Sequence, residues 1–208
     1  MKTIPKTNMK KEVTNMKTLK SFICLILAAA VLCSLSGSSA DGCWYGTTAS
    51  LLMRLSTRSG PGTEFDEPGT FFSGDWQYQT IQVMGKHHDG NIWWVQVDFT
   101  CGSKSYRVWT GLKRVNVDIR YIPEINSIGH GTVSATETRR GPGYYYAAGP
   151  RITHWQDVIA YGWENGFVEV EYRDFNQNRT YRAWVPESTV SIDALIPGSD
   201  GEYFNLIN

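Results

Sequence analysis

The chain has 208 residues, with 20 basic and 20 acidic side chains, a length that allows one or two domains. Residues 1–40 hold six lysines and one acid, which leaves 14 basic and 19 acidic side chains and a net charge of −5 in the rest. A mildly acidic surface argues against a nucleic-acid partner. No polybasic cluster or amphipathic helix remains to bind a membrane surface.

Residues 1–40 have the order of a secretory signal peptide. A lysine-rich lead precedes the apolar run FICLILAAAVLCSL, and the small residues SGSSA follow, with a cleavage site expected after Ala40. The apolar run is shorter than a transmembrane helix requires. We therefore expect a secreted or envelope-surface protein with no transmembrane segment in the mature chain. Translation could begin at Met1 or Met16.

Two cysteines, Cys43 and Cys101, remain after the predicted cleavage. An even pair outside the cytoplasm is most simply one disulfide. Its loop of roughly sixty residues would stabilise the fold by about 4 kcal/mol on the chain-entropy model. The alternative is two free, buried thiols.

Short runs that alternate apolar and polar residues fill the chain after residue 41. Gly, Asn, Asp and Pro separate them, and all eight Trp and eleven Tyr lie in this part. Such alternation and such aromatic content are typical of β-strands. The clearest runs are TIQVMG (80–85), WWVQVDF (93–99), YRVWTGL (106–112), DVIAYG (157–162), FVEVEY (167–172) and YRAWVP (181–186). The sequence predicts an all-β protein.

The runs occur twice in the same order. The matched pairs are TRSGPG (57–62) with TRRGPG (138–143), VMG (83–85) with AYG (160–162), WVQVDF (94–99) with FVEVEY (167–172), and YRVWT (106–110) with YRAWV (181–185). Loop insertions would shift the spacing by a few residues in this way, so we infer an internal duplication. The expected divisions are a signal peptide at 1–40, domains at 42–117 and 128–193, a linker at 118–127 and a tail at 194–208. The linker is short and partly apolar, which would allow the domains to pack together.

Each copy opens with Thr-Arg-x-Gly-Pro-Gly. Pro61 presets φ for the second position of a turn and Gly62 can supply a positive φ at the third, which predicts a type II turn. Pro142 and Gly143 repeat this in the second copy. Alone, Gly-Pro-Gly predicts a tight turn and nothing more.

With its surroundings, each copy resembles a bacterial SH3-like (Src homology 3 type) domain. That family shows Arg-x-Gly-Pro-Gly/Ser, an aromatic residue a few positions later and a final Gly-Trp-Val strand. The matching residues are Arg58, Gly60, Pro61, Gly62 and Phe65 in the first copy and Arg139, Gly141, Pro142, Gly143 and Tyr146 in the second. The final strands keep Trp109 and Trp184 but lack the glycine. The resemblance covers nearly all of 42–193 and implies two small SH3-like β-barrels in tandem that bind cell-wall components or peptides without catalysis or cofactor.

Strand alternation places aromatic rings on the polar face of two strands in each copy. In the first copy, Trp94 shares a face with Gln96 and Asp98, and Trp109 shares one with Arg107. The second copy repeats the pattern with Phe167, Glu169 and Glu171 on one strand and Arg182 and Trp184 on the next. These faces have two interpretations: a ligand-binding surface, or a second small core beneath the long turn that follows Gly-Pro-Gly.

The long turns supply further aromatic candidates. Flat rings in a polar loop can stack on sugars or hold peptides at low entropic cost. Some of them must instead anchor the loop, and the sequence does not say which. The predicted ligand contacts are Phe65, Phe71, Phe72, Trp76, Trp94, Trp109, Tyr144, Tyr145, Tyr146, Trp155, Phe167 and Trp184.

Other patterns indicate no catalytic or metal chemistry. The run His87-His88-Asp89-Gly90 predicts a solvated hairpin turn, and no third metal ligand lies near it. We interpret Glu169 and Glu171 as a solvated strand face. No nucleophile elbow, HExxH motif or phosphate-binding loop occurs, and two copies leave no room for a separate catalytic domain. We therefore predict that the protein is not an enzyme.

Two functions remain. The first is a tandem module that contacts cell-wall peptidoglycan or its peptides, with two weak sites gaining avidity on a repetitive polymer. The second is an adaptor or host-facing secreted factor that recognises a protein or peptide. The net negative charge of the mature part favours the second, because anionic wall polymers would repel it. The oligomeric state is left open.

Overall fold

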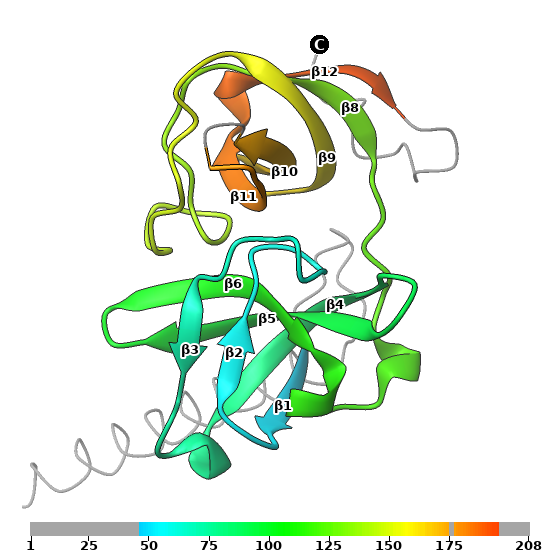
Figure 1. Ribbon diagram of the computed structural model, residues 1–208, viewed down its shortest axis with the longest axis vertical. Coiled ribbons are helices and arrows are strands. Elements are labelled where there is room, and N and C mark those ends of the chain that lie inside the picture. Colours follow the sequence, from blue (N-terminus) through cyan, green and yellow to red (C-terminus); the bar gives the residue numbers. More distant parts are fainter. Residues whose placement is uncertain (1–45, 175–176, 196–208) are drawn as a thin grey trace, which may run out of the picture. The chain divides into compact units, whose positions relative to one another are not determined.

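The computed structural model describes residues 46–174 and 177–195, and this part of the chain is an all-β protein (Figure 1). The predicted signal peptide, Cys43 and residues 196–208 lie outside it. The strands of the first half are β1 (Thr47–Leu51), β2 (Leu55–Thr57), β3 (Gly69–Phe71), β4 (Thr80–His88), β5 (Trp93–Cys101), β6 (Lys104–Gly111) and β7 (Val115–Asn116). The strands of the second half are β8 (Gly129–Val133), β9 (Gln156–Glu164), β10 (Phe167–Asp174), β11 (Arg179–Pro186) and β12 (Val190–Leu195). Strand β12 thus extends two residues into the predicted tail.

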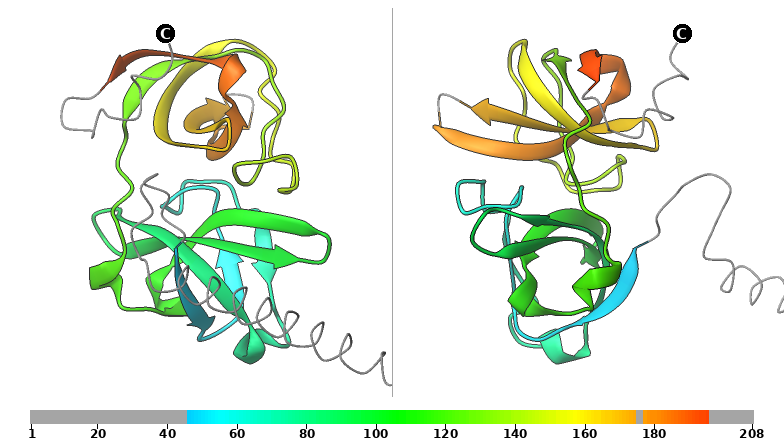
Figure 2. Two further views of the ribbon diagram at one scale, coloured as in Figure 1. Left: turned by 180° about the vertical axis from the view of Figure 1, so that it is seen from behind. Right: turned by 90° about the vertical axis from the view of Figure 1, so that its right-hand side faces the viewer.

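Two five-stranded antiparallel sheets have the same strand order. The first sheet runs β6-β5-β4-β1-β7 and the second runs β11-β10-β9-β8-β12. We call strands β1–β7 the first repeat and β8–β12 the second repeat. Each sheet is curled, as the two views in Figure 2 show, and each has its own hydrophobic core. The equivalent order is what an internal duplication predicts.

The same irregularity recurs in both sheets. Val83 pairs with Val97 and Gly85 with Gln96, so Met84 is left without a partner in the ladder. The shift between β9 and β10 falls at the equivalent place and leaves Tyr161 unpaired. Such β-bulges bend the strand and increase its twist, which helps each sheet to curl.

Apolar alternation explains the core of each repeat. The first core includes Val95, Val97, Phe99 and Val108, together with residues of β1 and β4. The second core is built in the same way, from Val168, Val170, Tyr172, Ala183 and Val185 with residues of β8 and β9. The apolar residues of the alternating runs therefore share one face of each sheet and line its core.

The predicted linker packs against the first repeat. Ile122 is 2% exposed and belongs to the first core. Lys86 on β4 donates its amide to the Pro123 carbonyl (2.8 Å) and accepts at its own carbonyl from the Ile125 amide (2.9 Å). The segment before β8 is therefore anchored to β4 by backbone hydrogen bonds and apolar burial. In the described part of the chain, no helix has the length and apolar character needed to cross a membrane.

Candidate functional site

Each Gly-Pro-Gly segment forms a three-residue turn. The Gly62 amide donates to the Gly60 carbonyl (3.0 Å), and the Gly143 amide donates to the Gly141 carbonyl (2.9 Å). This bond between residues i and i+2 closes a γ-turn around the proline. Neither Gly62 nor Gly143 has a positive φ, so the predicted type II turn is wrong. The proline fixes φ near the value that an inverse γ-turn needs at its centre.

The first glycine of each turn makes room for an aromatic ring. A Cβ on Gly60 would overlap the ring of Phe65, and a Cβ on Gly141 would overlap the ring of Tyr146. These two rings are 5% and 3% exposed. The motif therefore positions one buried aromatic side chain in each repeat.

These two aromatic residues join the repeats by backbone pairing. Phe65 forms a parallel bridge with Thr180, and Tyr146 forms a parallel bridge with Ser105. The amide of the following residue completes each bridge. The Asp66 amide donates to the Thr180 carbonyl at 3.1 Å, and the Ala147 amide donates to the Ser105 carbonyl at 2.9 Å. Equivalent residues of the two repeats thus make equivalent contacts with each other, as in an isologous dimer.

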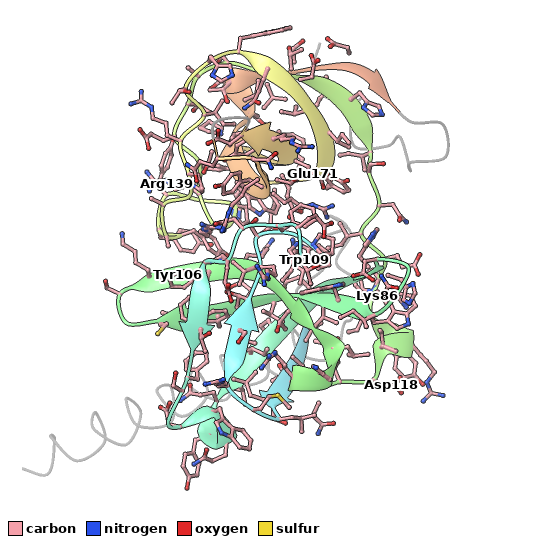
Figure 3. The ribbon with its side chains drawn as sticks, in the orientation of Figure 1. Lys86, Tyr106, Trp109, Asp118, Arg139 and Glu171 are labelled. Carbon is pink, nitrogen blue, oxygen red and sulfur yellow. The ribbon has the colours of Figure 1, made fainter. Side chains whose placement is uncertain are left out.

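Arg182 on β11 lies against aromatic rings of both repeats. Its guanidinium carbon is 5.3 Å from the ring centre of Trp109, 5.8 Å from that of Phe65 and 3.4 Å from that of Tyr161. It also forms an ion pair with Glu171 at 2.9 Å, and its side chain is only 2% exposed. Trp109 and Glu171 are both labelled in Figure 3. Cation–π contacts of this kind strengthen when they are desolvated.

Arg107 on β6 is the equivalent of Arg182. Its guanidinium carbon is 5.5 Å from the Trp184 ring centre and 5.9 Å from that of Tyr146. It forms ion pairs with Asp98 at 2.8 Å and with Glu164 at 2.5 Å. Burial lowers the pKa of this guanidinium, but the hydrogen bond to Glu164 and the charge of Asp98 outweigh burial, so the pKa is raised above its ordinary value.

Gln96 and Glu169 occupy equivalent positions and contact each other. The Gln96 amide donates to the Glu169 carboxylate at 2.7 Å, and the two residues are 3% and 4% exposed. Burial raises the pKa of Glu169, against the opposing influence of Arg182. The interpretation of Glu169 and Glu171 as a solvated face is therefore wrong for Glu169, because a residue of the other repeat covers it.

Other contacts between the repeats have no counterpart. Asp66 accepts from Arg140 at 3.0 Å and from Arg179 at 3.3 Å. The Tyr146 hydroxyl donates to Asp98 at 2.6 Å, a bond that the equivalent phenylalanine of the first repeat cannot make. The interface therefore combines two kinds of contact. The aromatic and arginine contacts occur twice, once from each repeat, whereas the ion pairs of Asp66 occur once and have no equivalent with the repeats exchanged.

The structure divides the twelve predicted ligand contacts into three groups. Six are buried: Phe65, Trp94, Trp109, Tyr146, Phe167 and Trp184. Three are partly buried against the first core: Phe71, Phe72 and Trp76. Three are exposed: Tyr144 (68%), Tyr145 (60%) and Trp155 (65%). A ligand contact at the six buried rings stays a prediction and would require those rings to be uncovered.

Tyr144 and Tyr145 form the exposed aromatic pair of the second repeat. Tyr144 meets the Phe167 ring edge-on at 5.1 Å between ring centres, and the guanidinium carbon of Arg139 lies 5.6 Å from its centre. Tyr145 is tilted against Tyr146 at 4.5 Å. Buried or half-buried neighbours thus hold both rings while their outer surfaces remain free.

The histidine run forms the end of β4 rather than the turn itself. Asp89 makes the turn, with its carboxylate accepting from the Ile92 amide at 2.9 Å and from the Trp94 indole at 2.8 Å. These bonds lower the pKa of Asp89, the backbone bond being the largest cause. His88 packs against Trp93 at 4.8 Å. Within residues 46–174 and 177–195, no three potential ligands gather as a metal site would require.

Cys101 is the last residue of β5 and is partly exposed. Its predicted partner, Cys43, lies outside the described residues. The disulfide therefore stays a prediction.

The sequence interpretation missed the role of the polar side chains beside the rings. Arg107, Arg182, Gln96 and Glu169 line the interface between the repeats, yet only their strand face was predicted. The signal that could have found them is the Arg-x-Trp pattern at the same place in both copies. A buried arginine requires partners, and each repeat carries the matching rings and carboxylates.

The comparisons add no relative. The chain matches no protein-family model, no curated protein and no solved structure. Function is therefore proposed from the residues of the chain itself.

Proposed function

We propose that the chain is a secreted, non-enzymatic binding protein of two SH3-like repeats. In this proposal the exposed Tyr144–Tyr145 pair contacts the glycan strands or peptide stems of cell-wall peptidoglycan. The first support is the order of each repeat, in which Arg-x-Gly-Pro-Gly and a buried aromatic residue lie between the first strand of a curled antiparallel sheet and the strands that complete it. That order agrees with the resemblance drawn from the sequence. Secretion is proposed from residues 1–40, which lie outside the described part.

The exposed aromatic pair carries the proposal. Tyr144 and Tyr145 present flat surfaces that are 68% and 60% exposed on a loop anchored by Tyr146 and Phe167. Aromatic rings that are already held in place lose little freedom on binding, and they suit the apolar faces of sugar rings or peptide side chains. Most other predicted contact residues are used inside the fold, which concentrates the proposed site on this loop.

Sedimentation with purified peptidoglycan sacculi tests the proposal. The expected result is that the chain pellets with sacculi and that the double variant Tyr144→Ala/Tyr145→Ala pellets at least tenfold less, since ring stacking is worth about 1 kcal/mol or more per ring. Tyr78→Ala is the matched control, because Tyr78 is 81% exposed but belongs to the first repeat. Absence of pelleting at every salt concentration would reject the proposal. Equal loss in the Tyr78 variant would reject the site.

A protein or peptide ligand is the second candidate. The observation that favours it is the net charge of −5 on residues 41–208, which opposes binding to anionic wall polymers. Under this alternative the same tyrosines contact a protein, and sacculi are ignored. Binding of a defined peptide by the wild-type chain, lost in the double tyrosine variant while sacculi fail to pellet, would select it.

A further inference from the structure

The long loops of the two repeats carry opposite charge. Residues 57–79 of the first repeat contain one arginine and four acids, whereas residues 138–156 of the second contain three arginines and no acid. Aligned on the Gly-Pro-Gly turns, Glu64, Asp66 and Glu67 are replaced by Tyr145, Ala147 and Ala148. The exposed tyrosines therefore lie in a basic loop on a chain that is acidic elsewhere.

Two of the three arginines are already paired. Arg140 binds Asp66 at 3.0 Å, and Arg151 binds Glu137 at 3.4 Å. The third, Arg139, makes no side-chain hydrogen bond or ion pair with any described residue. Its contact is with the ring of Tyr144 at 5.6 Å, and its Nε atom is buried without an acceptor. Arg139 is thus a partly exposed cation beside the exposed aromatic pair.

The equivalent arginine of the first repeat shows what Arg139 lacks. Arg58 donates from Nη1 to the Phe65 carbonyl at 3.2 Å and lies 3.8 Å from the Glu67 carboxylate. The two arginines occupy equivalent backbone positions, since Arg58 forms a β-bridge with Trp109 and Arg139 forms one with Trp184. Because the second repeat has alanine where the first has Glu67, its arginine keeps its charge available for an external acceptor.

We infer that the loop at residues 138–156 binds a carboxylate-bearing part of its ligand. Arg139 pairs with the carboxylate, and the rings of Tyr144 and Tyr145 pack on the adjoining sugar or peptide. A planar guanidinium suits this role because it can donate two parallel hydrogen bonds to one carboxylate. The inference rests on the proposed function and names its ligand chemistry: the free carboxylates of peptidoglycan peptides, rather than its neutral sugars.

The test uses the full chain and two preparations of sacculi. In one preparation the carboxylates are native, and in the other they are converted to amides with carbodiimide and ammonia. The expected result is that the wild-type chain binds amidated sacculi roughly tenfold more weakly, since hydrogen bonds to charged groups contribute that much or more. Arg139→Gln should bind native sacculi as weakly as wild type binds the amidated ones, and amidation should not weaken this variant further.

Arg58→Gln is the matched control and should bind native sacculi like wild type. An unchanged thermal midpoint for Arg139→Gln shows that the loss is not unfolding. Equal wild-type binding to native and amidated sacculi would overturn this inference and leave the proposed function standing, as would full binding by Arg139→Gln. Equal loss in the Arg58 variant would also overturn the inference. Failure of wild type to bind either preparation would overturn both.

Discussion

The two repeats are most alike where they contact each other and least alike where they face solvent. Trp109 and Trp184 each lie under an arginine of the opposite repeat, at 5.3 and 5.5 Å. The loops after Gly-Pro-Gly, in contrast, differ in length, charge and aromatic content. This part of the interface is self-complementary, because equivalent residues of the two repeats make equivalent contacts with each other. The exposed parts of the loops, which do not contact the other repeat, carry no such requirement.

The interface nevertheless departs from symmetry at its centre. Glu169 faces Gln96 rather than another copy of itself, so one carboxylate is buried instead of two. Two ionised carboxylates facing each other there would repel, whereas an amide can donate to one. Tyr146 adds a hydroxyl that Phe65 lacks. These differences can be removed one at a time.

The largest expected effect comes from the paired tryptophans. Trp109→Ala and Trp184→Ala should each lower the free energy of unfolding by about 3–5 kcal/mol, as is usual for truncation of a buried aromatic residue. Both residues are buried, at 0% and 4% exposure. Urea unfolding followed by circular dichroism should show one transition, shifted to lower denaturant in both variants, because each ring lies in the shared interface.

Tyr78→Ala is the control for this pair and should change stability by no more than about 0.5 kcal/mol, since Tyr78 is 81% exposed. Two separate transitions, with only the substituted repeat destabilised, would show that the repeats unfold independently. The reciprocal contacts would then contribute little to stability.

Strand alternation was enough to predict the fold class and the inner faces. The run that became β5 put Val95 and Val97 on one side and Trp94 and Gln96 on the other, and the structure agrees. Alternation says which residues share a face but not what covers that face. The sequence alone therefore places Glu169 in solvent, since its partner Gln96 is 73 positions away in the sequence.

Turn geometry and loop exposure were also beyond the sequence. Gly-Pro-Gly fits both a type II turn and a γ-turn, and the structure has the γ-turn, with an aromatic ring packed on the first glycine. Tyr144, Tyr145 and Tyr146 are chemically identical neighbours, yet only Tyr146 is buried. The difference arises because Tyr146 pairs with Ser105 of the other repeat, a contact that no local pattern reveals.

Tyr146→Phe should have the next largest effect. It makes the second repeat resemble the first at this position and removes the bond from the hydroxyl to Asp98 at 2.6 Å. A hydrogen bond to a charged group contributes about 1.5–3 kcal/mol, and Arg107 still pairs with Asp98, so we expect a loss near the lower end. Urea unfolding measures it. An unchanged midpoint would mean that the hydrogen bond from the Tyr146 hydroxyl to Asp98 adds no stability beyond what hydrogen bonds to water provide in the unfolded chain.

Glu169→Gln makes the central pair symmetric and should change the pH dependence of stability. Burial raises the pKa of Glu169 in the folded chain, although the charge of Arg182 and the hydrogen bond from Gln96 lower it. The folded chain therefore holds a proton at pH values where the unfolded chain has lost it. Stability due to this group is present below the ordinary glutamate pKa and is lost as pH rises through the raised pKa.

The glutamine variant should not show that loss, so its stability relative to wild type should increase with pH above the ordinary glutamate range. Unfolding free energies measured at several pH values from 4 to 8 test this. Glu187→Gln, on the exposed surface, is the matched control. A wild-type chain that gains stability relative to the variant as pH rises would contradict the assignment of Glu169 as the buried acid.

The smallest expected effect on stability belongs to the exposed loop. Tyr144→Ala/Tyr145→Ala should change the unfolding free energy by no more than about 1 kcal/mol, because both rings are mostly in solvent and surface substitutions cost little. The reverse exchange, Thr63→Tyr/Glu64→Tyr, gives the first repeat the same rings. It should add little sacculus binding, because Arg58 remains committed to Phe65 and Glu67. Strong added binding by this variant would show that rings alone suffice, and that the free arginine does not distinguish the two repeats.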